Sequence, residues 1–293
     1  MLEFKSIELS DKPIIEKFYK KKNYFLCGYC FTDIFIWAHA YNTKFAVEDG
    51  FIFMSYTDEG EVTFSAPIGE GDYKKALEKL KEYADSISAP LRIDMVPPDH
   101  IQLIEDAMPG YFDFVQSLDY ADYIYSAEKL MYLKGKKLHG KRNHINKFMQ
   151  TYSNWSYEPL TDENTKEFFE YQLDWCKDDP DEFLGETCAV SIALKNREAL
   201  GIVGGLLRLD GKIIAVTLGS ESFPDTFIVQ IEKADHTIQG AYQMINQQFA
   251  LHNFEKYTYI DREEDMGIEG LRKAKQSYYP EFQAEVYYAI PKQ

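Results

Sequence analysis

The sequence predicts a mixed α/β fold in which one arrangement of helices and strands occurs twice. Hydrophobic residues make up 45% of the 293-residue chain, enough for packed cores. The aromatic content of 15% favours sheets packed on helices over a coiled coil. Strand-like and helix-like segments alternate in two rounds of the same order, which predicts one domain over residues 1–128 and a second over residues 129–293.

The first round opens with a strand over 4–9 and a helix over 11–22, whose first turn holds Pro13. Segments with helical and strand-like apolar spacing follow. They predict helices over 31–41, 72–88 and 100–108, strands over 44–57, 61–69 and 90–96, and one or two strands over 111–125. Asp49-Gly50 predicts a turn inside the first of these strand segments.

The second round repeats this order and also ends on a strand. It predicts helices over 134–150, 163–176, 188–200, 238–253 and 270–279, and strands over 155–160, 203–210, 212–221, 226–234, 256–261 and 284–290. Asp210-Gly211 joins two of these strands and is a strong hairpin signal.

The formal net charge of −16 repels nucleic acid and anionic lipid over most of the surface. No run of about 18 apolar residues predicts a membrane span, and the N-terminal segment lacks the apolar core of a secretion signal. We therefore expect a cytoplasmic protein.

The chain has four cysteines, too few for a disulfide scaffold of this size. Cys27 and Cys30 form a CxxC motif, but Cys176 and Cys188 are spaced too widely to complete a zinc site. We interpret the cysteines as core residues and predict no metal site, with redox or metal chemistry at the CxxC motif as the alternatives.

A basic island covers residues 131–150, which contain two histidines and no acid. Its basic residues are Lys134, Lys136, Lys137, Lys141, Arg142 and Lys147. On a helix, Lys137, Lys141 and His144 share one face. A solvated helix face is one interpretation, but in so acidic a chain the island favours an anion-binding role, with a phosphate-bearing ligand as the natural partner.

A second charged motif, "IEKADHTIQGAY", follows an apolar strand. Glu232 and Lys233 stand where that strand ends, a place where functional side chains of open α/β sheets collect. Glu232 is predicted to act as a base or to bind an amine, and the alternative is an ion pair with Lys233 or another neighbour. Gly240 and Ala241 begin a helix whose amide groups can meet an anion.

The third motif, "REEDMGIEGLRKAKQSYYP", places acids beside bases at the end of another strand. Gly267 and Gly270 permit a tight entry into the helix that follows. Acids that hold an amine would lie beside bases that hold a phosphate, so a ligand carrying both groups would fit. The alternative is an internal charge network that closes the strand end.

The segments "GKKLHGKRNHINKF", "EKA" and "REEDMGIEGLRKAKQSYYP" resemble the DUF2156 group, which is related to the C-terminal domain of phosphatidylglycerol lysyltransferases. The resemblance covers most of the chain. It implies two tandem GNAT-like acyltransferase domains, as in Fem-type peptidyltransferases. It also implies aminoacyl transfer from aminoacyl-tRNA to an amine or hydroxyl of a small molecule, a peptide or a lipid headgroup.

We expect the site in the second domain, because the charged motifs occur there. The predicted catalytic residues are Glu232, Glu263 and Asp265, and the predicted substrate-binding residues are Lys137, Lys141, Arg142, Asn143, Lys233, Arg262, Arg272, Lys275 and Tyr278. Lys137, Lys141 and Arg142 would hold donor phosphate, and the three acids would bind the aminoacyl ammonium or assist proton transfer.

Two alternatives remain, an acyl-CoA-dependent transferase and a non-catalytic module that binds a small anionic or amino-acid ligand. Acetyltransferases of the GNAT group hold the CoA pyrophosphate with a Q/R-x-x-G-x-G/A loop. When this chain is aligned on Gly240, Thr237 and Tyr242 stand at the outer positions of that loop, which disfavours acetyl-CoA.

Overall fold

A computed structural model describes residues 1–58, 60–176 and 180–292, without the side chains of residues 175–184. The chain divides into two compact units, one formed by Met1–Ala121 plus the segment that begins at Ala284, and the other by Asp122–Gln283. This division differs from the predicted boundary at 128/129, because residues 122–128 belong to the second unit and the C-terminal segment belongs to the first.

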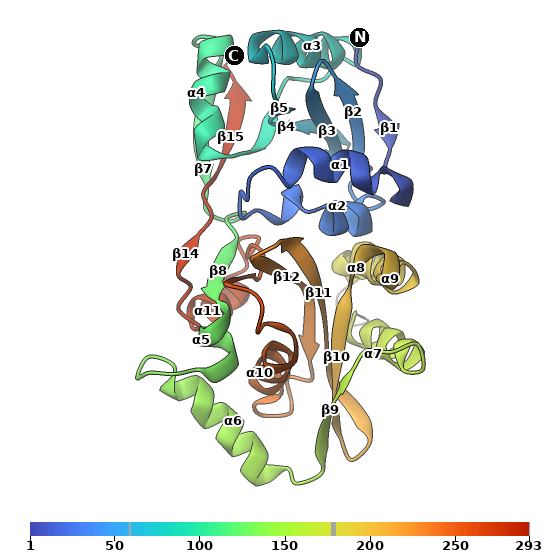
Figure 1. Ribbon diagram of the computed structural model, residues 1–293, viewed down its shortest axis with the longest axis vertical. Coiled ribbons are helices and arrows are strands. Elements are labelled where there is room, and N and C mark those ends of the chain that lie inside the picture. Colours follow the sequence, from blue (N-terminus) through green and yellow to red (C-terminus); the bar gives the residue numbers. More distant parts are fainter. Residues whose placement is uncertain (59, 177–179, 293) are drawn as a thin grey trace. The chain divides into compact units, whose positions relative to one another are not determined.

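The first unit is a mixed sheet with helices (Figure 1). Its strands are β1 (Lys5–Ser6), β2 (Lys44–Glu48), β3 (Phe51–Asp58), β4 (Glu61–Ser65), β5 (Ile68–Gly69), β6 (Ile93–Val96), β7 (Phe112–Ser117) and β15 (Val286–Pro291), and its helices are α1 (Lys12–Tyr19), α2 (Phe31–Trp37), α3 (Tyr73–Ser86) and α4 (Pro98–Ala107). The strand order is β1-β2-β3-β4-β6-β15-β7, with β5 paired to β3 and with β4 and β6 parallel. Buried residues of α3 and α4 pack with those of the sheet in one core.

The second unit follows the same plan. Its strands are β8 (Tyr123–Ser126), β9 (Trp155–Pro159), β10 (Val203–Leu209), β11 (Lys212–Phe223), β12 (Thr226–Ala234), β13 (Tyr259–Asp261) and β14 (Phe282–Gln283), and its helices are α5 (Ala127–Tyr132), α6 (His139–Thr151), α7 (Thr165–Cys176), α8 (Pro180–Lys195), α9 (Arg197–Leu200), α10 (Ala241–Asn253) and α11 (Glu269–Gln276). The strand order is β14-β8-β13-β12-β11-β10-β9, with β12 and β13 parallel. Helices α5, α6 and α10 share a core with one face of this sheet, and α7 to α9 lie on the other face (Figure 1).

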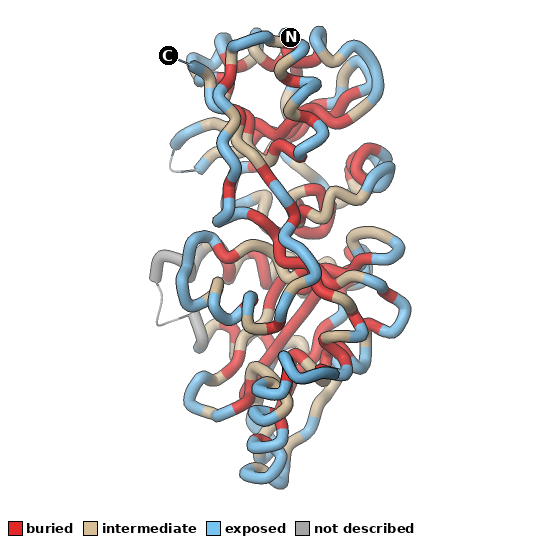
Figure 2. The backbone as a smooth tube through the Cα atoms, turned by 90° about the vertical axis from the view of Figure 1, so that its left-hand side faces the viewer, coloured by how far each residue is buried: buried red, intermediate tan, exposed pale blue. Residues whose placement is uncertain are grey.

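Buried residues follow the strands of each unit, whereas α6 is mostly exposed (Figure 2). Along α6, Ile145 and Phe148 are buried in the core of the second unit together with Leu138, which precedes the helix. Within the part of the chain that the structure describes, no helix combines the length and apolar character needed to cross a bilayer.

The C-terminal strand returns to the first sheet. The strand β15 lies between β6 and β7, and β8 lies between β13 and β14. The strand predicted over 284–290 for the second domain therefore belongs to the first sheet, and the segment 111–125 splits into β7 of the first sheet and β8 of the second. Alternating apolar residues predict a strand but do not choose its neighbour, which is why the sequence misplaced these two segments.

Both predicted hairpin turns are confirmed. Asp49 and Gly50 have φ angles of 49° and 83°, and Asp210 and Gly211 have φ angles of 49° and 78°. Two consecutive positive φ angles are what a two-residue type I′ turn requires, and Asp-Gly is a preferred pair for it.

The parallel strands β12 and β13 pair only over a short stretch. Thr226–Ile228 of β12 pair with Tyr259–Asp261, but β12 continues to Ala234 while the chain leaves β13 at Asp261. Among the described residues, the second half of β12 therefore has no strand partner on the side where β13 lies. The side chains that follow β13 can approach it there, which makes this point the natural position for a site.

A bulge in β12 decides which side chains face α10. The pairing with β11 shifts between Leu218 and Gly219, which leaves Gln230 as the extra residue. Val229 and Ala234 are five residues apart, yet both belong to the core that contains α10. Without the bulge, strand alternation would place them on opposite faces. Glu232, two residues before Ala234, shares this face.

Gly240 caps α10 and brings it against α6. Its φ is 89°, and a Cβ atom there would lie 2.7 Å from the main-chain oxygen of His144. We expect Gly240→Ala to lower the free energy of unfolding by about 1–3 kcal/mol, because backbone strain and the clash act together. Thermal unfolding measures the effect.

Gly270→Ala is the matched control. Gly270 lies inside α11 with open space around it. The predicted tight turn into this helix is therefore formed by Gly267 alone, which has a φ of 75°. Alanine in this helix is expected to stabilise the protein by about 0.5–1 kcal/mol. Equal changes in melting temperature for the two variants would contradict the assignment.

Candidate functional site

The centre of the site is an ion pair between Glu232 and Arg262. Nη2 of Arg262 donates to Oε1 of Glu232 at 2.8 Å. The side chain of Arg262 is only 12% exposed and that of Glu232 only 11%. Arg262 is the first residue after β13, and Glu232 lies in the part of β12 that has parted from β13. Asn246 of α10 donates from Nδ2 to Oε2 of Glu232 at 2.9 Å, so each carboxylate oxygen has one donor.

The cations of this site, Arg262 and Lys141, lie over tyrosine rings. The guanidinium of Arg262 lies 5.0 Å from the ring centroid of Tyr278 and 5.8 Å from that of Tyr125. The Nζ atom of Lys141, from α6, lies 3.9 Å from the centroid of Tyr278. All three are cation–π distances. The two basic segments, which are far apart in the sequence, therefore meet at Tyr278 within the second unit.

The site carries more positive than negative charge. Burial and the nearby Arg262 lower the pKa of Lys141 to about 8, although Glu232 acts in the opposite direction. Burial raises the pKa of Tyr278 well above its ordinary value, against the effect of Arg262, so this ring stays neutral. Lys141 makes no hydrogen bond or ion pair with any residue that the structure describes. The cations Lys141 and Arg262 thus lie near a single carboxylate, that of Glu232. An anionic ligand would balance the remaining positive charge.

Two buried polar atoms beside Glu232 lack partners. Arg262 Nη1 is a donor without an acceptor, and Asn246 Oδ1 is an acceptor without a donor, among the residues described here. A buried polar atom that stays unpaired costs about 1–3 kcal/mol. A ligand with one hydrogen-bond acceptor and one donor would satisfy both atoms.

The other predicted residues of the basic island lie apart from this centre. Lys137 precedes α6 instead of sharing its face, and its Nζ lies 5.4 Å from the ring centroid of Tyr279. Asn143 is exposed and contacts His139 at 3.1 Å. The guanidinium of Arg142 donates to the carbonyls of Leu133 and Gly135, which follow α5. Arg142 therefore closes the end of a helix, and we leave it out of the proposed site.

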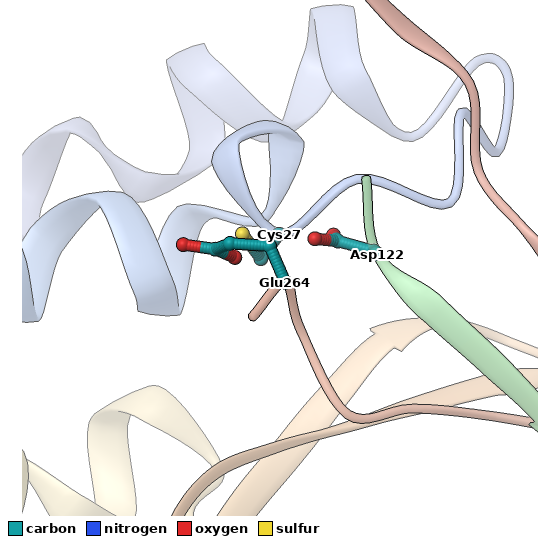
Figure 3. Close-up of side chains that lie close together, drawn as sticks. All are labelled: Cys27, Asp122 and Glu264. Atoms are coloured by element: carbon teal, nitrogen blue, oxygen red, sulfur yellow. The ribbon is translucent and has the colours of Figure 1, made fainter. Parts of the chain in front are cut away.

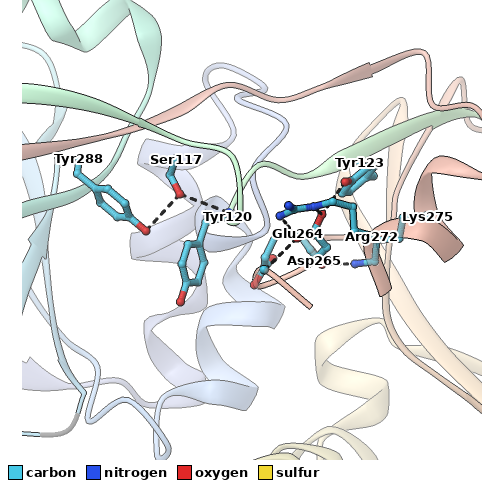
Figure 4. A network of polar contacts seen from close by, with 9 residues as sticks. Ser117, Tyr120, Tyr123, Glu264, Asp265, Arg272, Lys275 and Tyr288 are labelled. Carbon is cyan, nitrogen blue, oxygen red and sulfur yellow. Dashed lines mark hydrogen bonds and ion pairs between the residues drawn. The ribbon is translucent and has the colours of Figure 1, made fainter. Parts of the chain in front are cut away.

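Asp265 lies in a closed network (Figure 4). Its carboxylate accepts hydrogen bonds from the Tyr123 hydroxyl at 2.6 Å, from the Gly267 amide at 2.9 Å and from Arg272 at 2.7 and 2.8 Å. Burial alone would raise the pKa of Asp265, but these donors hold it below its ordinary value. For Asp265 and Arg272 the geometry matches the alternative of an internal charge network, so we assign neither of them a role in the reaction.

Lys275 is buried among acids of the same unit. Its ammonium donates to the main-chain oxygen of Glu264 (Figure 4), and burial lowers its pKa although Glu263, Glu264 and Asp122 act against this. A carboxylate oxygen of Asp122 and one of Glu264 lie within 4.8 Å of each other (Figure 3). Lys275 is thus the counter-ion of these acids, Glu263 included, and we assign it no role in substrate binding.

Lys233 points to the opposite face of the sheet. It pairs with Glu186 of α8 at 2.9 Å, whereas Glu232 faces α10. The predicted alternative, an ion pair of Glu232 with Lys233 or another neighbour, is met by Arg262. Lys233 is not the partner, because adjacent strand residues point in opposite directions.

Sequence reasoning missed Asn246 and Tyr125. Asn246 lies among apolar residues on the buried face of α10, and a polar residue in such a position signals a specific partner. Tyr125 is fully buried in β8, and its hydroxyl donates to the main-chain oxygen of Lys275 at 2.7 Å. Nothing in the strand pattern around Tyr125 distinguished it from an ordinary core residue.

The cysteine side chains that the structure describes are buried or partly buried. Cys30 is buried, Cys27 and Cys188 are partly buried, and the side chain of Cys176 lies outside the described residues. Cys27 begins a single 3-10 turn before α2, not the strand-to-helix junction expected of a redox CxxC motif.

A family model for the C-terminal region of phosphatidylglycerol lysyltransferase matches residues 21–290. The crystal structure of a conserved protein of unknown function from Bacteroides thetaiotaomicron is 41% identical, with a TM-score of 0.92, and the alignment covers 100% of both chains. An uncharacterized protein from Mycoplasmoides gallisepticum is 30% identical over 170 residues, 55% of this chain and 53% of the relative. The chain therefore matches about half the length of this curated relative.

More distant structures show the fold alone. The C-terminal domain of a putative lysylphosphatidylglycerol synthetase from Agrobacterium fabrum is 12% identical, with a TM-score of 0.66, over 97% of this chain and 92% of that one. A tandem GNAT protein from the clavulanic acid pathway is 10% identical, with a TM-score of 0.52, over 100% of both chains. The predicted tandem GNAT-like architecture is confirmed.

Proposed function

Because the chain belongs to the family defined by the C-terminal region of phosphatidylglycerol lysyltransferases, we propose that it transfers an aminoacyl group from aminoacyl-tRNA to an amine or hydroxyl acceptor. The family relationship supports aminoacyl transfer as the class of reaction. The observation that carries the proposal is the pair of unsatisfied atoms, Arg262 Nη1 and Asn246 Oδ1, on either side of the Glu232 carboxylate.

An aminoacyl ester matches these atoms. Its ammonium group donates to Asn246 Oδ1 and to Glu232, and its ester carbonyl oxygen accepts from Arg262 Nη1. The ammonium of Lys141, which has no anionic partner among the described residues, holds a phosphate of the donor.

The reaction follows from this placement. The acceptor nitrogen or oxygen attacks the ester carbonyl carbon, and its new bond to that carbon replaces the bond to the ribose oxygen. The acceptor proton passes to the departing ribose oxygen. Arg262 is positioned to stabilise the negative charge on the carbonyl oxygen during the attack, and the protein otherwise acts by orienting the two substrates.

The same geometry disfavours an acyl-CoA donor. A simple acyl group has no ammonium for Asn246 and Glu232. In addition, the main chain of α6 lies against Gly240 at the start of α10, where a pyrophosphate loop of the acetyltransferase type would stand. A thermal shift with CoA esters but none with charged tRNA would reverse this choice of donor.

The test is binding and turnover of aminoacyl-tRNA that carries a radiolabelled amino acid, with a panel of amines, alcohols and lipid headgroups as acceptors. We expect label to move to one acceptor class, and Lys141→Glu to weaken tRNA binding at least tenfold. The matched control is Lys212→Glu, at the exposed start of β11. Equal affinity of the wild type and Lys141→Glu would contradict the proposal, and tight binding without turnover would indicate a non-catalytic module.

A further inference from the structure

The sheet of the first unit opens at the same place in its strand order as the sheet of the second unit. The parallel strands β4 and β6 occupy the positions that β12 and β13 occupy in the second sheet. Only two residue pairs join them, Phe64 with Ile93 and Ser65 with Asp94, and β4 ends at Ser65. Ligands of open α/β sheets bind beyond the carboxyl ends of strands, where neighbouring strands part. The end of β4 is therefore a natural position for a second site.

A chain of aromatic rings runs through this part of the first unit, where α1 and α2 lie against the sheet (Figure 1). The ring centroid of Tyr29 lies 5.0 Å from that of Tyr19, the last residue of α1, and 5.0 Å from that of Tyr24. His100 continues the chain, 5.8 Å from Tyr24 and 5.9 Å from Tyr73. Together with a tyrosine of β3, these residues form what we call the aromatic cluster: Tyr19, Tyr24, Tyr29, Tyr56, Tyr73 and His100.

Three hydroxyl groups of the aromatic cluster are unpaired. The hydroxyl oxygens of Tyr19, Tyr56 and Tyr73 are buried and have no hydrogen-bond partner among the described residues. Tyr29 differs, because its hydroxyl donates to the main-chain oxygen of Met95 in β6 at 2.6 Å. A buried hydroxyl without a partner lowers the stability of a fold. A partner from outside the chain is therefore expected for these groups.

Two of the unpaired hydroxyls meet at Ser65. Tyr56 stands opposite Thr63 in the pairing of β3 with β4, so Ser65, two residues further on, presents its side chain on the same face. Burial raises the pKa of Tyr19 and of Tyr56, and the Ser65 hydroxyl, which lies beside both, acts in the opposite direction. Ser65 is only 1% exposed, and its own hydrogen bond, to the main-chain oxygen of Ala66, is long at 3.4 Å. Three hydroxyl oxygens thus converge at the end of β4.

The electrostatic field at these hydroxyls is negative. Burial raises the pKa of Tyr56, and the carboxylates of Asp94 and Asp33 raise it further, although Asp94 pairs with Arg92 at 2.8 Å. Cys27 acts in the same direction as the two acids. Such a field disfavours phosphate and carboxylate ligands and favours a cation. The tyrosine rings favour the same choice, because the faces of aromatic rings attract organic cations.

We propose that the aromatic cluster binds the ammonium group of a small primary amine. The three N–H bonds of this group match the three hydroxyl oxygens of Tyr19, Tyr56 and Ser65. A quaternary ammonium ion has no N–H bond for these oxygens, and an alcohol of the same length has no charge. Tyr24 and Tyr56 are only partly buried, so the cluster reaches the surface of the protein. This inference does not rest on the proposed function, because it concerns the first unit and involves no transfer.

The test is a calorimetric titration of the whole protein with propylamine near neutral pH, and with tetramethylammonium and propanol as comparison ligands. We expect saturable binding of propylamine and at least about tenfold weaker binding of the other two, which lack either the N–H bonds or the charge. Tyr56→Phe keeps the ring and removes one of the oxygens, so its affinity for propylamine should fall about tenfold. Its melting temperature should equal or exceed that of the wild type, because the lost hydroxyl is unpaired.

Tyr29→Phe is the matched control, because the hydroxyl of Tyr29 is already paired within the chain. This variant should melt at a lower temperature than the wild type and bind propylamine as the wild type does. Glu232→Gln removes the carboxylate to which the proposed function assigns an ammonium group. It should also retain the binding of propylamine, because the aromatic cluster belongs to the first unit.

Five results would overturn the inference. These are no saturable binding of propylamine, equal affinity for all three compounds, unchanged affinity in Tyr56→Phe, loss of binding in Glu232→Gln, and a lowered melting temperature of Tyr56→Phe, which would mean that ordered water already satisfies its hydroxyl. Propylamine binding that depends on Tyr56 in a protein without aminoacyl transfer would refute the proposed function alone. Aminoacyl transfer by a protein that does not bind propylamine would refute this inference alone.

Discussion

The Arg262→Met variant is expected to lose aminoacyl transfer by at least about 100-fold and to unfold at a lower temperature than the wild type. The activity falls because no donor remains for the ester carbonyl oxygen, and removal of one such donor typically lowers turnover by about 10²–10³-fold. The stability falls by about 3–5 kcal/mol because Glu232, only 11% exposed, keeps its charge without its cation partner.

The double variant Arg262→Met/Glu232→Gln separates these two effects. It removes both charges, and the glutamine retains an oxygen that accepts from Asn246. We expect most of the lost stability to return, because no unpaired charge remains buried, while transfer stays lost. Thermal unfolding and the transfer assay are measured on the same preparations.

An opposite pattern would contradict the assignment. If the double variant regained transfer together with stability, the ion pair would serve only the fold. If Arg262→Met kept normal transfer at a temperature where it is folded, Arg262 would not stabilise the carbonyl oxygen.

The affinity of the protein for its anionic ligand is expected to fall about tenfold between pH 7 and pH 9. Lys141 has a pKa of about 8, and only its protonated form attracts a phosphate. Below pH 8 the amine is charged and the affinity is constant, and above pH 8 the affinity falls by up to tenfold per pH unit. Titration of charged tRNA across this range measures the profile.

Lys141→Met should bind weakly at every pH and show no step near pH 8. Lys147→Met, from the exposed side of α6, is the control and should retain the step. A wild-type profile that stays flat through pH 9 would contradict the role of Lys141.

The same pKa affects stability in the opposite direction. The unfolded chain has the ordinary lysine pKa of 10.5, so between about pH 8 and 10.5 it binds a proton that the folded protein does not. Stability contributed by this group therefore rises with pH over that window. Weaker ligand binding above pH 8 thus cannot be attributed to unfolding driven by Lys141.

The family resemblance and the order of elements predicted much of the fold, but they did not predict how the chain shares its strands. The turns at Asp49-Gly50 and Asp210-Gly211 depend on their own backbone angles, so local sequence was sufficient there. The sheet to which β8 and β15 belong depends on pairing with distant strands, which no local pattern records.

The charged residues of the candidate site illustrate the same limit. The predicted list contained Glu232, Arg262, Lys141 and Tyr278, which the fold brings together. It also contained residues such as Asp265 and Lys275, which are equally charged and close in sequence to Arg262. Composition and spacing do not distinguish a side chain that closes a loop from one that faces a ligand.

By itself, the sequence determined the two hairpin turns and the clustering of charge into segments of the second unit. Only the tertiary structure decided which charges remain available. The bulge at Gln230 turns Glu232 towards α10, and the parting of β12 from β13 lets Arg262 reach it. The physical reason is that local backbone preferences act within a few residues, whereas burial and pairing of a charge depend on atoms brought from far along the chain.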